Sequence, residues 1–477
     1  MEKFFTSLEE NQEWLLTIPL GEYAQLFPPL GRVYLPCASY DEMMEWALPP
    51  AKSVQLVNVK LGLEKEREDV AQFMRGGYWR YFFVKYPEAN QMHKKMLQVH
   101  KKVYQAKAVG ETDCGLDELW QGQCNCAYWH GIFGGLYLAD IRAATYHHLI
   151  QAEDMADEVI HATEEWLDSS ETDFDYDGRN ETIVDGNTFS LYLSPQQGGS
   201  LIEWDLRHPG YNLLSTIARR FEAYHQEISK EQGKITDTSD KVRSIHEGIQ
   251  VRDDKLAGLI SYDRYPRYSL IDHFLPPDIT LEQFTSCSYE ELGDFANQLY
   301  QLELEKQGPF LKIIMRRSDK LHCEGRWLPF EVKKEIVIEA GKEELRINYQ
   351  LSNKGKAVAS GVFGSEWNIN LLGGGHNEQA YYEVPDITLD DYHLDSTGAL
   401  SGIGELSLGN KHLGIRLGLA IEPPAALWRF PVETISNSEA GLERLYQGSC
   451  LLFLVPFNLP PGTSQVLSLK WAVARQK

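Results

Sequence analysis

The sequence has few basic residues for its length and no long apolar run. Its 46 Lys and Arg residues face 69 Asp and Glu residues, which leaves a formal net charge of −23. Nucleic-acid binding needs clustered Lys and Arg on one surface, so this charge argues against a nucleic-acid partner. No apolar stretch approaches the ~20 residues that a membrane-spanning helix needs, and we therefore expect no membrane partner.

Signals for export are also missing. The first residues, Met-Glu-Lys-Phe-Phe-Thr-Ser, contain no apolar core of a secretory signal peptide. The seven cysteines are an odd number scattered over a long chain, which favours reduced thiols over a disulfide framework. Together these features predict a cytoplasmic protein.

Common catalytic motifs are absent as well. The sequence contains no G-x-S-x-G nucleophile motif, no G-x-x-x-x-G-K-[ST] phosphate loop and no G-x-G-x-x-G dinucleotide motif. The glycine-rich run at 373–376 is followed by no phosphate motif, so it predicts no phosphate site. Glu203 and Asp205 alternate on an expected strand, and we interpret them as surface charge.

The chain does contain a clear change of pattern near its first third. Before that point, apolar residues such as Met92, Met96 and Val99 recur at helical spacing and predict a helical domain over 53–168. Beyond it, polar and apolar residues alternate, with Gly, Pro and Asn between the runs. This pattern predicts a large antiparallel β-sandwich over 169–477 and an α+β fold class for the whole chain.

Residues 1–52 are too few to form a domain of their own. Short strand-like runs at 17–20 and 32–36 interrupt this segment. We expect it to be the end of a larger preceding domain.

The stretch from 121 to 138 is the densest in groups that bind ligands. It begins Gln-Gly-Gln-Cys-Asn-Cys-Ala-Tyr-Trp-His-Gly and combines aromatic faces for stacking with amides and an imidazole for hydrogen bonds. Its glycines allow the backbone to approach a ligand closely. We predict a substrate-binding segment, with a packed helix start as the alternative. The predicted binding residues are Gln123, Asn125, Tyr128, Trp129 and His130.

A zinc site in the same stretch is disfavoured. Its ligands would be Cys124, Cys126 and His130, but this spacing is not a usual zinc pattern and no second ligand pair follows.

Three aspartates followed by a glycine resemble the start of a calcium loop. Calcium takes oxygen ligands, and the pattern D-x-D-x-D-G places three carboxylates around one turn. The Glu that would complete an EF-hand is missing, although Glu181 or Asp185 could supply another oxygen. We predict a structural Ca²⁺ site at Asp173, Asp175 and Asp177, with a solvated acidic turn as the alternative.

Several longer motifs together resemble one enzyme family. The motifs are Tyr34–Pro49, Gly77–Arg80 with Val84–His93, Gly122–Gly131, Tyr262–Tyr265 with Ser269–Phe274, and Pro431–Glu439. On these motifs the chain is similar to glycoside hydrolase family 57, the branch of α-amylases and 4-α-glucanotransferases, over nearly all of its length. The resemblance implies three parts in order: a catalytic (β/α)₇ barrel, a helical middle domain, and a β-sandwich related to galactose mutarotase.

The resemblance also implies a chemistry. Enzymes of this family act on α-1,4-glucans by a retaining mechanism, with a Glu nucleophile and an Asp general acid/base in the barrel, and they need no cofactor. The motifs that carry these carboxylates are not found here. The resemblance therefore assigns no catalytic residue to this chain, makes 1–52 a remnant of the barrel's end, and places Trp129-His130-Gly131 beside the active-site cleft.

Two functions follow from this resemblance. In the first, the chain is the C-terminal portion of a 4-α-glucanotransferase or α-amylase that acts on maltooligosaccharides. This portion is inactive alone and needs the catalytic barrel of a separate or longer chain. The second is a non-catalytic α-glucan-binding module. A mutarotase-like activity rests on fold analogy alone, because the sequence identifies no paired His and Glu.

Overall fold

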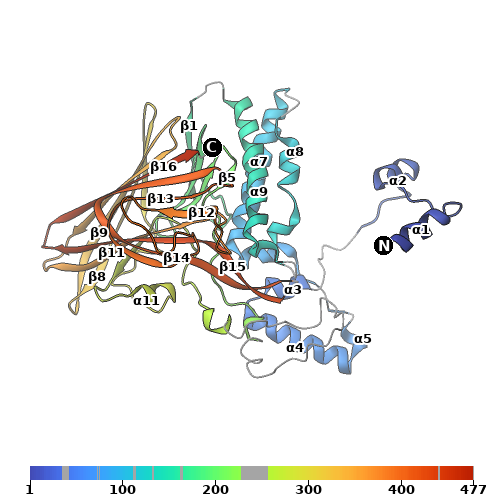
Figure 1. Cartoon of the computed structure of the whole chain (residues 1–477), viewed down its shortest axis with the longest axis horizontal. Helices are drawn as coiled ribbons and strands as arrows, with labels where there is room; N and C mark the ends of the chain where they lie inside the picture. The colour runs from blue at the N-terminus through green and yellow to red at the C-terminus, as the bar shows by residue number, and fades with distance from the viewer. Residues whose placement is uncertain are drawn as a thin grey trace.

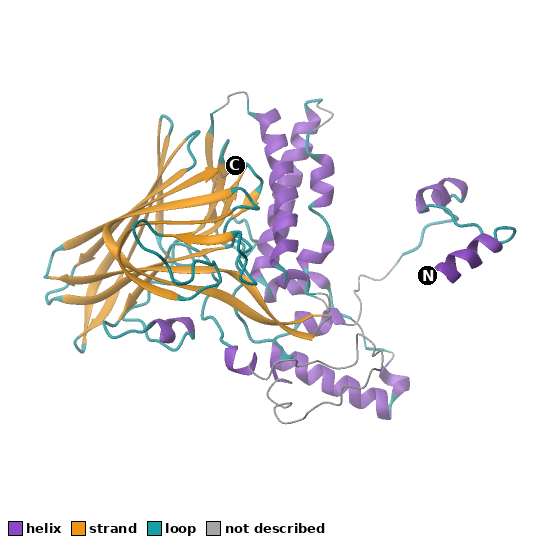
Figure 2. Cartoon of the chain, viewed as in Figure 1, coloured by secondary structure: helices purple, strands orange, loops and turns teal. Residues whose placement is uncertain are grey.

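A computed structural model of the chain describes residues 1–34, 42–71, 73–74, 76–110, 114–130, 134–161, 165–226, 256–438 and 441–475. Helices dominate up to Ile160, and antiparallel strands dominate after it (Figures 1 and 2). No helix among the described residues is both long and apolar enough to cross a membrane. The α-helices of this first part are α1 (Glu2–Glu10), α2 (Leu20–Leu26), α3 (Glu42–Ala47), α4 (Pro50–Glu66), α5 (Glu68–Ala71), α6 (Phe82–Lys85), α7 (Pro87–Ala108), α8 (Leu116–Gln121) and α9 (Ala139–Ile160).

Helix α7 illustrates why these residues form helices. Pro87 occupies the first turn, where its missing N–H costs nothing, and Glu88 places a negative charge at the positive end of the helix dipole. Met92, Val99 and Val103 are 0% exposed and share one face. The predicted helical spacing of Met92 and Val99 is therefore confirmed, and this face packs toward α9 (Figure 1).

In the described part of the chain, the strands form two antiparallel sheets. The first has five strands in the order β1-β2-β3-β4-β5, and the second has eleven, with β6-β11-β15-β14-β16-β10-β9-β8-β7 along its main path. The predicted succession of a helical domain and a large antiparallel β domain is confirmed. Short helix α11 (Leu281–Thr285) lies between β6 and β7. The strands are β1 (Leu167–Thr172), β2 (Glu181–Gly186), β3 (Phe189–Ser194), β4 (Ser200–Leu206), β5 (Tyr211–Asn212), β6 (Ile271–Leu275), β7 (Gln301–Gln307), β8 (Phe310–Cys323), β9 (Arg326–Glu339), β10 (Glu344–Asn353), β11 (Ala359–Ile369), β12 (Ala380–Glu383), β13 (Gly398–Asn410), β14 (Ile415–Ser438), β15 (Gly441–Leu459) and β16 (Ser464–Arg475).

The five-stranded sheet is covered on both faces. On one face Leu191 and Trp204 join a core that also contains Phe363 of the larger sheet. On the opposite face Lys95 of α7 donates a hydrogen bond of 3.0 Å to the Tyr192 hydroxyl. Every residue of β3 and β4 is therefore buried. The sheet joins the helices to the rest of the β domain.

The prediction that Glu203 and Asp205 carry surface charge is wrong. Both are 0% exposed, because strand alternation directs them to the face that the helices cover. Lys95 Nζ lies 2.8 Å from Asp205 Oδ2, 3.5 Å from Glu203 Oε1 and 2.6 Å from Glu153 Oε2 of α9. Burial, helped by the neighbouring Asp205, raises the pKa of Glu203 well above its ordinary value. This ion network fastens two helices to the sheet.

Helices α1 and α2 stand apart from the rest of the protein (Figure 1). Neither helix has a buried residue. Large apolar side chains are exposed, among them Phe4 at 61%, Trp14 at 75% and Leu20 at 82%. This segment carries an apolar surface that nothing in the described part of the chain covers.

The strands predicted in this segment are wrong where the structure describes it. Instead of a strand over 17–20, α2 begins at Leu20, and residues 32–34 form no strand; the rest of the predicted 32–36 run lies outside the described residues. A strand needs a hydrogen-bonded partner, and an isolated run has none. The barrel remnant inferred for 1–52 stays a prediction.

Candidate functional site

The ligand-rich stretch folds into two short 3-10 turns, at Asn125–Tyr128 and Gly135–Tyr137. Residues 131–133 between them lie outside the described part of the chain. Gly135 has a φ of +50°, and a Cβ placed there would lie 2.2 Å from the Trp129 carbonyl oxygen. Only glycine fits this close approach, which holds the Trp129 backbone against the second turn.

The five predicted binding residues differ in how exposed their side chains are. Gln123 and Asn125 are exposed, whereas Tyr128 is 4% and His130 0% exposed, and Trp129 is half-buried between them. The aromatic and imidazole groups therefore point inward, and the two amides face the solvent.

His130 lies among aromatic rings. Its ring centroid is 4.0 Å from that of Trp46, 4.7 Å from that of Tyr137 and 6.0 Å from that of Tyr224. Burial lowers the pKa of His130 to about 4, despite the opposing charge of Glu222, so the imidazole is neutral at physiological pH. Neither ring nitrogen makes a well-formed hydrogen bond to another described residue. His130 is 0% exposed, so the imidazole packs inside this aromatic cluster rather than facing a substrate directly.

Glu222 supplies the carboxylate beside this ring. Its Oε1 accepts hydrogen bonds from Tyr86 Oη at 2.6 Å and Tyr137 Oη at 2.8 Å, and its Oε2 lies 2.9 Å from Lys85 Nζ. Burial would raise its pKa, but the charge and hydrogen bond of Lys85, with the hydrogen bond from Tyr86, outweigh burial and lower it below the ordinary value. Among the described residues, the acidic oxygens of Glu222 are thus held by two phenols and an ammonium group.

Sequence reasoning missed most of the residues around His130. Trp46 and Tyr137 lie inside the stretches described above, but no sequence pattern identifies them as neighbours of the imidazole. Glu222 and Tyr224 lie more than ninety positions away in a segment without any recognised motif. Only the folded chain brings these four residues together.

An aromatic strip leads from this cluster to the surface. The ring centroids of Trp79 and His93 are 5.7 Å apart, and those of His93 and Tyr128 are 6.1 Å apart. Trp79 is 43% exposed, and its neighbours Tyr78 and Tyr81 are 42% and 51% exposed. Exposed rings of this kind present apolar faces next to hydrogen-bonding edges.

Comparisons with known proteins identify the family. The chain matches the sequence model described as alpha-amylase/4-alpha-glucanotransferase, C-terminal, over residues 173–469, and the corresponding middle domain over residues 77–156. It belongs to the α-amylase/4-α-glucanotransferase family. The larger match alone covers more than half of the chain.

Relatives in this family are longer than the chain. Alpha-amylase 1 of Dictyoglomus thermophilum is 34% identical over 484 residues, which cover 99% of this chain and 66% of that protein. The 4-alpha-glucanotransferase of Thermococcus litoralis is 31% identical over 460 residues, or 96% of this chain and 63% of that protein. Its crystal structure aligns with a TM-score of 0.74 and 28% identity over 100% of this chain. The chain spans about two thirds of the length of these relatives.

The three aspartates predicted to bind calcium lie together in this family member. One carboxylate oxygen from each of Asp173, Asp175 and Asp177 lies within 4.8 Å of the others. Gly178 has a φ of +89°, and its N–H donates to Asp173 Oδ2 at 3.1 Å. The turn is closed by its own aspartates, and the arrangement fits an oxygen-liganded cation.

Of the two additional oxygen donors considered for this turn, only Glu181 faces it. Glu181 Oε2 accepts a hydrogen bond of 3.1 Å from Phe174 N, and burial with the nearby Asp175 raises the pKa of Glu181 to about 7. Asp185 instead lies 3.0 Å from Lys102 Nζ in the network between helices and sheet.

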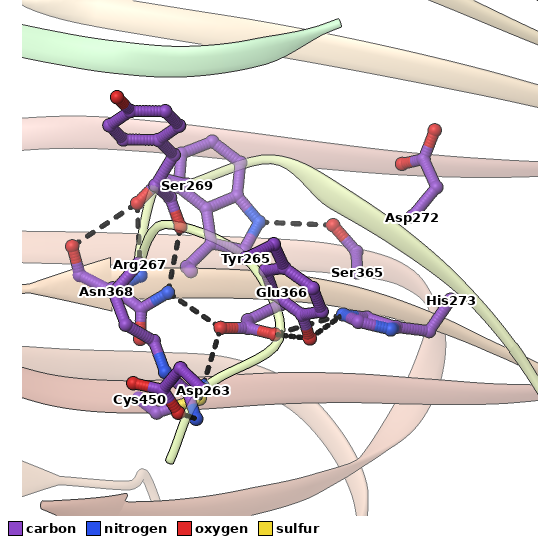
Figure 3. A network of polar contacts seen from close by, with 12 residues as sticks. Asp263, Tyr265, Arg267, Ser269, Asp272, His273, Ser365, Glu366, Asn368 and Cys450 are labelled. Carbon is purple, nitrogen blue, oxygen red and sulfur yellow. Dashed lines mark hydrogen bonds and ion pairs between the residues drawn. The ribbon is translucent and has the colours of Figure 1, made fainter. Parts of the chain in front are cut away.

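A second buried cluster lies in the β domain and includes the His–Glu pair that the sequence did not reveal (Figure 3). His273 Nε2 of β6 lies 2.9 Å from Glu366 Oε2 of β11, and Arg267 Nη1 lies 2.8 Å from Glu366 Oε1. His273 Nδ1 is 2.6 Å from Glu291 Oε1. His273 and Glu366 are 0% exposed and Arg267 is 2% exposed, so the cluster ties β6 to β11 rather than facing a substrate.

The charge on His273 should make the free energy of unfolding depend on pH between neutral and alkaline values. Burial alone would lower its pKa, but Glu291 and Glu366 raise it from 6.5 to about 9. The folded protein then keeps a proton that the unfolded chain has released, so the unfolding free energy should fall as pH rises from about 6.5 through about 9. Urea denaturation across this range measures the decline. It should be smaller in His273→Gln, and an unchanged slope in that variant would contradict the assignment.

Proposed function

We propose that this chain forms the middle and C-terminal part of a retaining enzyme acting on α-1,4-glucans, either a 4-α-glucanotransferase or an α-amylase of glycoside hydrolase family 57. Its two catalytic carboxylates would come from a (β/α)₇ barrel that the 477 residues do not contain. Relatives with both names match 96–99% of the chain, which supports this proposal.

The observation that carries the proposal is the set of accessible side chains in the stretch that precedes His130. A sugar ring needs aromatic faces against its C–H groups and hydrogen-bonding partners for its hydroxyls. In this segment Trp129 is half-buried and Gln123 and Asn125 are exposed, so an aromatic side chain and two amides are available beside the buried His130. A retaining mechanism also needs two carboxyl groups about 5 Å apart, whereas Glu222 is held by phenols and an ammonium group. The segment therefore suits one wall of a sugar cleft.

The apolar surface of α1 and α2 gives the barrel a place to dock. Large exposed apolar patches commonly mark interaction sites. Phe4, Trp14 and Leu20 provide such a surface, and the family models that match the rest of the chain are described as a middle and a C-terminal domain.

A fusion protein tests the proposal. The part of the Thermococcus litoralis 4-alpha-glucanotransferase that precedes the aligned region would be joined to the N-terminus of this chain. We expect the fusion to redistribute or hydrolyse maltotetraose, and the unfused chain to leave it unchanged, as chromatography of the products would reveal. Equal turnover by the unfused chain would refute the proposal that the barrel supplies the catalytic carboxylates.

A second candidate function is a non-catalytic α-glucan-binding module. The exposed strip of Tyr78, Trp79 and Tyr81 favours it, because aromatic faces can bind sugars without any carboxylate pair. Titration of the unfused chain with maltohexaose, followed by Trp fluorescence, measures such binding. Trp79→Ala should weaken it, whereas Trp327→Ala, which removes another exposed Trp in the β domain, should not.

We further propose that the turn of Asp173, Asp175 and Asp177 holds a structural Ca²⁺. Calcium should raise the melting temperature of chelator-treated protein by about 2–4 °C, and Asp175→Asn should abolish this rise. The rise should grow as pH increases through about 7, because Glu181 must lose its proton to face the cation. Asp278→Asn, an exposed aspartate elsewhere, serves as the control. A calcium response that survives in Asp175→Asn would contradict the site.

A further inference from the structure

A group of histidines and acids lies on two loops of the β domain, outside the features described so far. One ligand atom from each of His376, Asp391 and His393 lies within 4.8 Å of the others. His376 ends the glycine-rich run after β11, and the other two residues lie between β12 and β13. The group thus joins two loops that are separate in the sequence.

The hydrogen bonds of His393 fix which of its nitrogens is available. Its Nδ1 lies 2.8 Å from Asp391 Oδ1, and because a carboxylate only accepts, Nδ1 carries the proton and donates. The lone pair of His393 is therefore on Nε2. This atom is buried, the residue is 7% exposed, and Nε2 has no hydrogen-bond partner among the described residues. A carboxylate that orients a histidine in this way is typical of metal sites.

Further donors lie around this nitrogen. Glu378 Oε2 is 3.9 Å from His393 Nε2 and accepts a hydrogen bond of 2.8 Å from Tyr392 Oη, which holds the carboxylate in place. The second oxygen of Asp391 lies 4.0 Å from His376 Nε2. Asp391 already accepts the His393 Nδ1 proton, so its oxygens lie on the other side of the ring from an ion bound at Nε2. Two imidazoles and the Glu378 carboxylate remain as direct donors, and this nitrogen and oxygen set, with one position left for water, suits Zn²⁺ and chemically similar ions.

The backbone around the group is anchored. The His376 N–H donates to Asp395 Oδ2 at 2.6 Å, and Arg429 Nη2 of β14 donates to the Asp391 carbonyl oxygen at 2.7 Å. The rings of His376 and His393 are stacked with centroids 3.7 Å apart. Because the His376 side chain is 63% exposed, it can turn until its nitrogen and His393 Nε2 face the same point.

We propose that His376, His393 and Glu378 bind one divalent transition-metal ion of the zinc type, with Asp391 orienting His393 through its Nδ1–H. The ion would cross-link the glycine-rich loop to the loop before β13. It is independent of the calcium turn, whose ligands are oxygens only, and of the glucan-binding proposal.

Metal titration of the full chain tests this site. The chain, purified without a histidine tag and stripped with a chelator, would be titrated with Zn²⁺ against a chromophoric competitor and with Co²⁺ by visible absorption. We expect one tight equivalent of Zn²⁺, and Co²⁺ bands of tetrahedral intensity that excess Ca²⁺ does not remove. His376→Asn should weaken Zn²⁺ binding about 100-fold or more, since it deletes a direct ligand.

The variants separate this site from other histidines. Asparagine tolerates the left-handed φ of +57° at position 376, so His376→Asn should keep the fold. His148→Asn removes a histidine of α9 that lies 2.7 Å from Glu118 and should bind Zn²⁺ as the wild type does. Absence of a tight equivalent in the wild type, or undiminished affinity in His376→Asn, would overturn the proposal.

Discussion

The Lys95→Met variant is expected to lose about 3–5 kcal/mol of folding free energy, or to fail to fold. Lys95 is 0% exposed, and its Nζ lies 2.6 Å from Glu153 and 2.8 Å from Asp205, which are also 0% exposed. Removal of the ammonium group leaves buried carboxylates without their nearest counter-charge, and breaking a buried pair in this way typically costs that amount. Urea denaturation of both proteins, analysed with the same dependence of unfolding free energy on urea concentration, measures this loss.

A matched lysine on the same helix provides the control. Lys101 is exposed on α7, and Lys101→Met should change the free energy of unfolding by no more than about 0.5 kcal/mol. A loss for Lys95→Met as small as that of the control would mean that the buried acids are protonated and need no ammonium group. If Lys95→Met is destabilising as expected, Asp205→Asn in the same background should recover part of the stability, since it removes a buried carboxylate whose ion pair with Lys95 has been lost.

In the barrel fusion, Trp129→Ala is expected to lower kcat/KM for maltooligosaccharides by about 100-fold, because loss of one wall displaces the sugar from the attacking groups. Trp129 is half-buried beside His130, and its backbone is fixed by Gly135, so the loss should come from binding geometry rather than from unfolding. Steady-state kinetics and circular dichroism of the same samples separate these two causes.

Two further variants sharpen this result. Trp129→Phe keeps an aromatic face and should retain more activity than Trp129→Ala. Trp120→Ala removes a Trp of α8 that is 56% exposed, and it should behave as the unmodified fusion does. Wild-type turnover by Trp129→Ala would show that the sugar does not contact this ring.

The sequence predicted the succession of helices and antiparallel strands because periodicity is a local property. Met92 and Val99 report the buried face of α7 without knowledge of any other element. The same reasoning failed for Glu203 and Asp205, since alternation tells which residues share a face but not what covers that face. The partner there is Lys95, more than a hundred residues earlier in the chain.

The candidate site was predicted in part for a related reason. Tyr128, Trp129 and His130 are consecutive, so their composition drew attention to them. Glu222 and Tyr224 approach the imidazole only through the tertiary fold, and no local pattern marks them. The same holds for His376 and His393, which come together only because the segment before β13 folds back along β12, where His393 pairs with Tyr381.

The two-sided burial of the five-stranded sheet has a consequence for how such chains evolve. One family match ends at residue 156 and the other begins at residue 173. This gap suggests that the two regions could be exchanged independently. A break there would expose the face that carries Glu203 and Asp205 to water and would part both acids from Lys95. Recombination could therefore exchange either region for that of a distant homologue only if the matching charges came with it. We expect the helices and the sheet to be inherited as one unit.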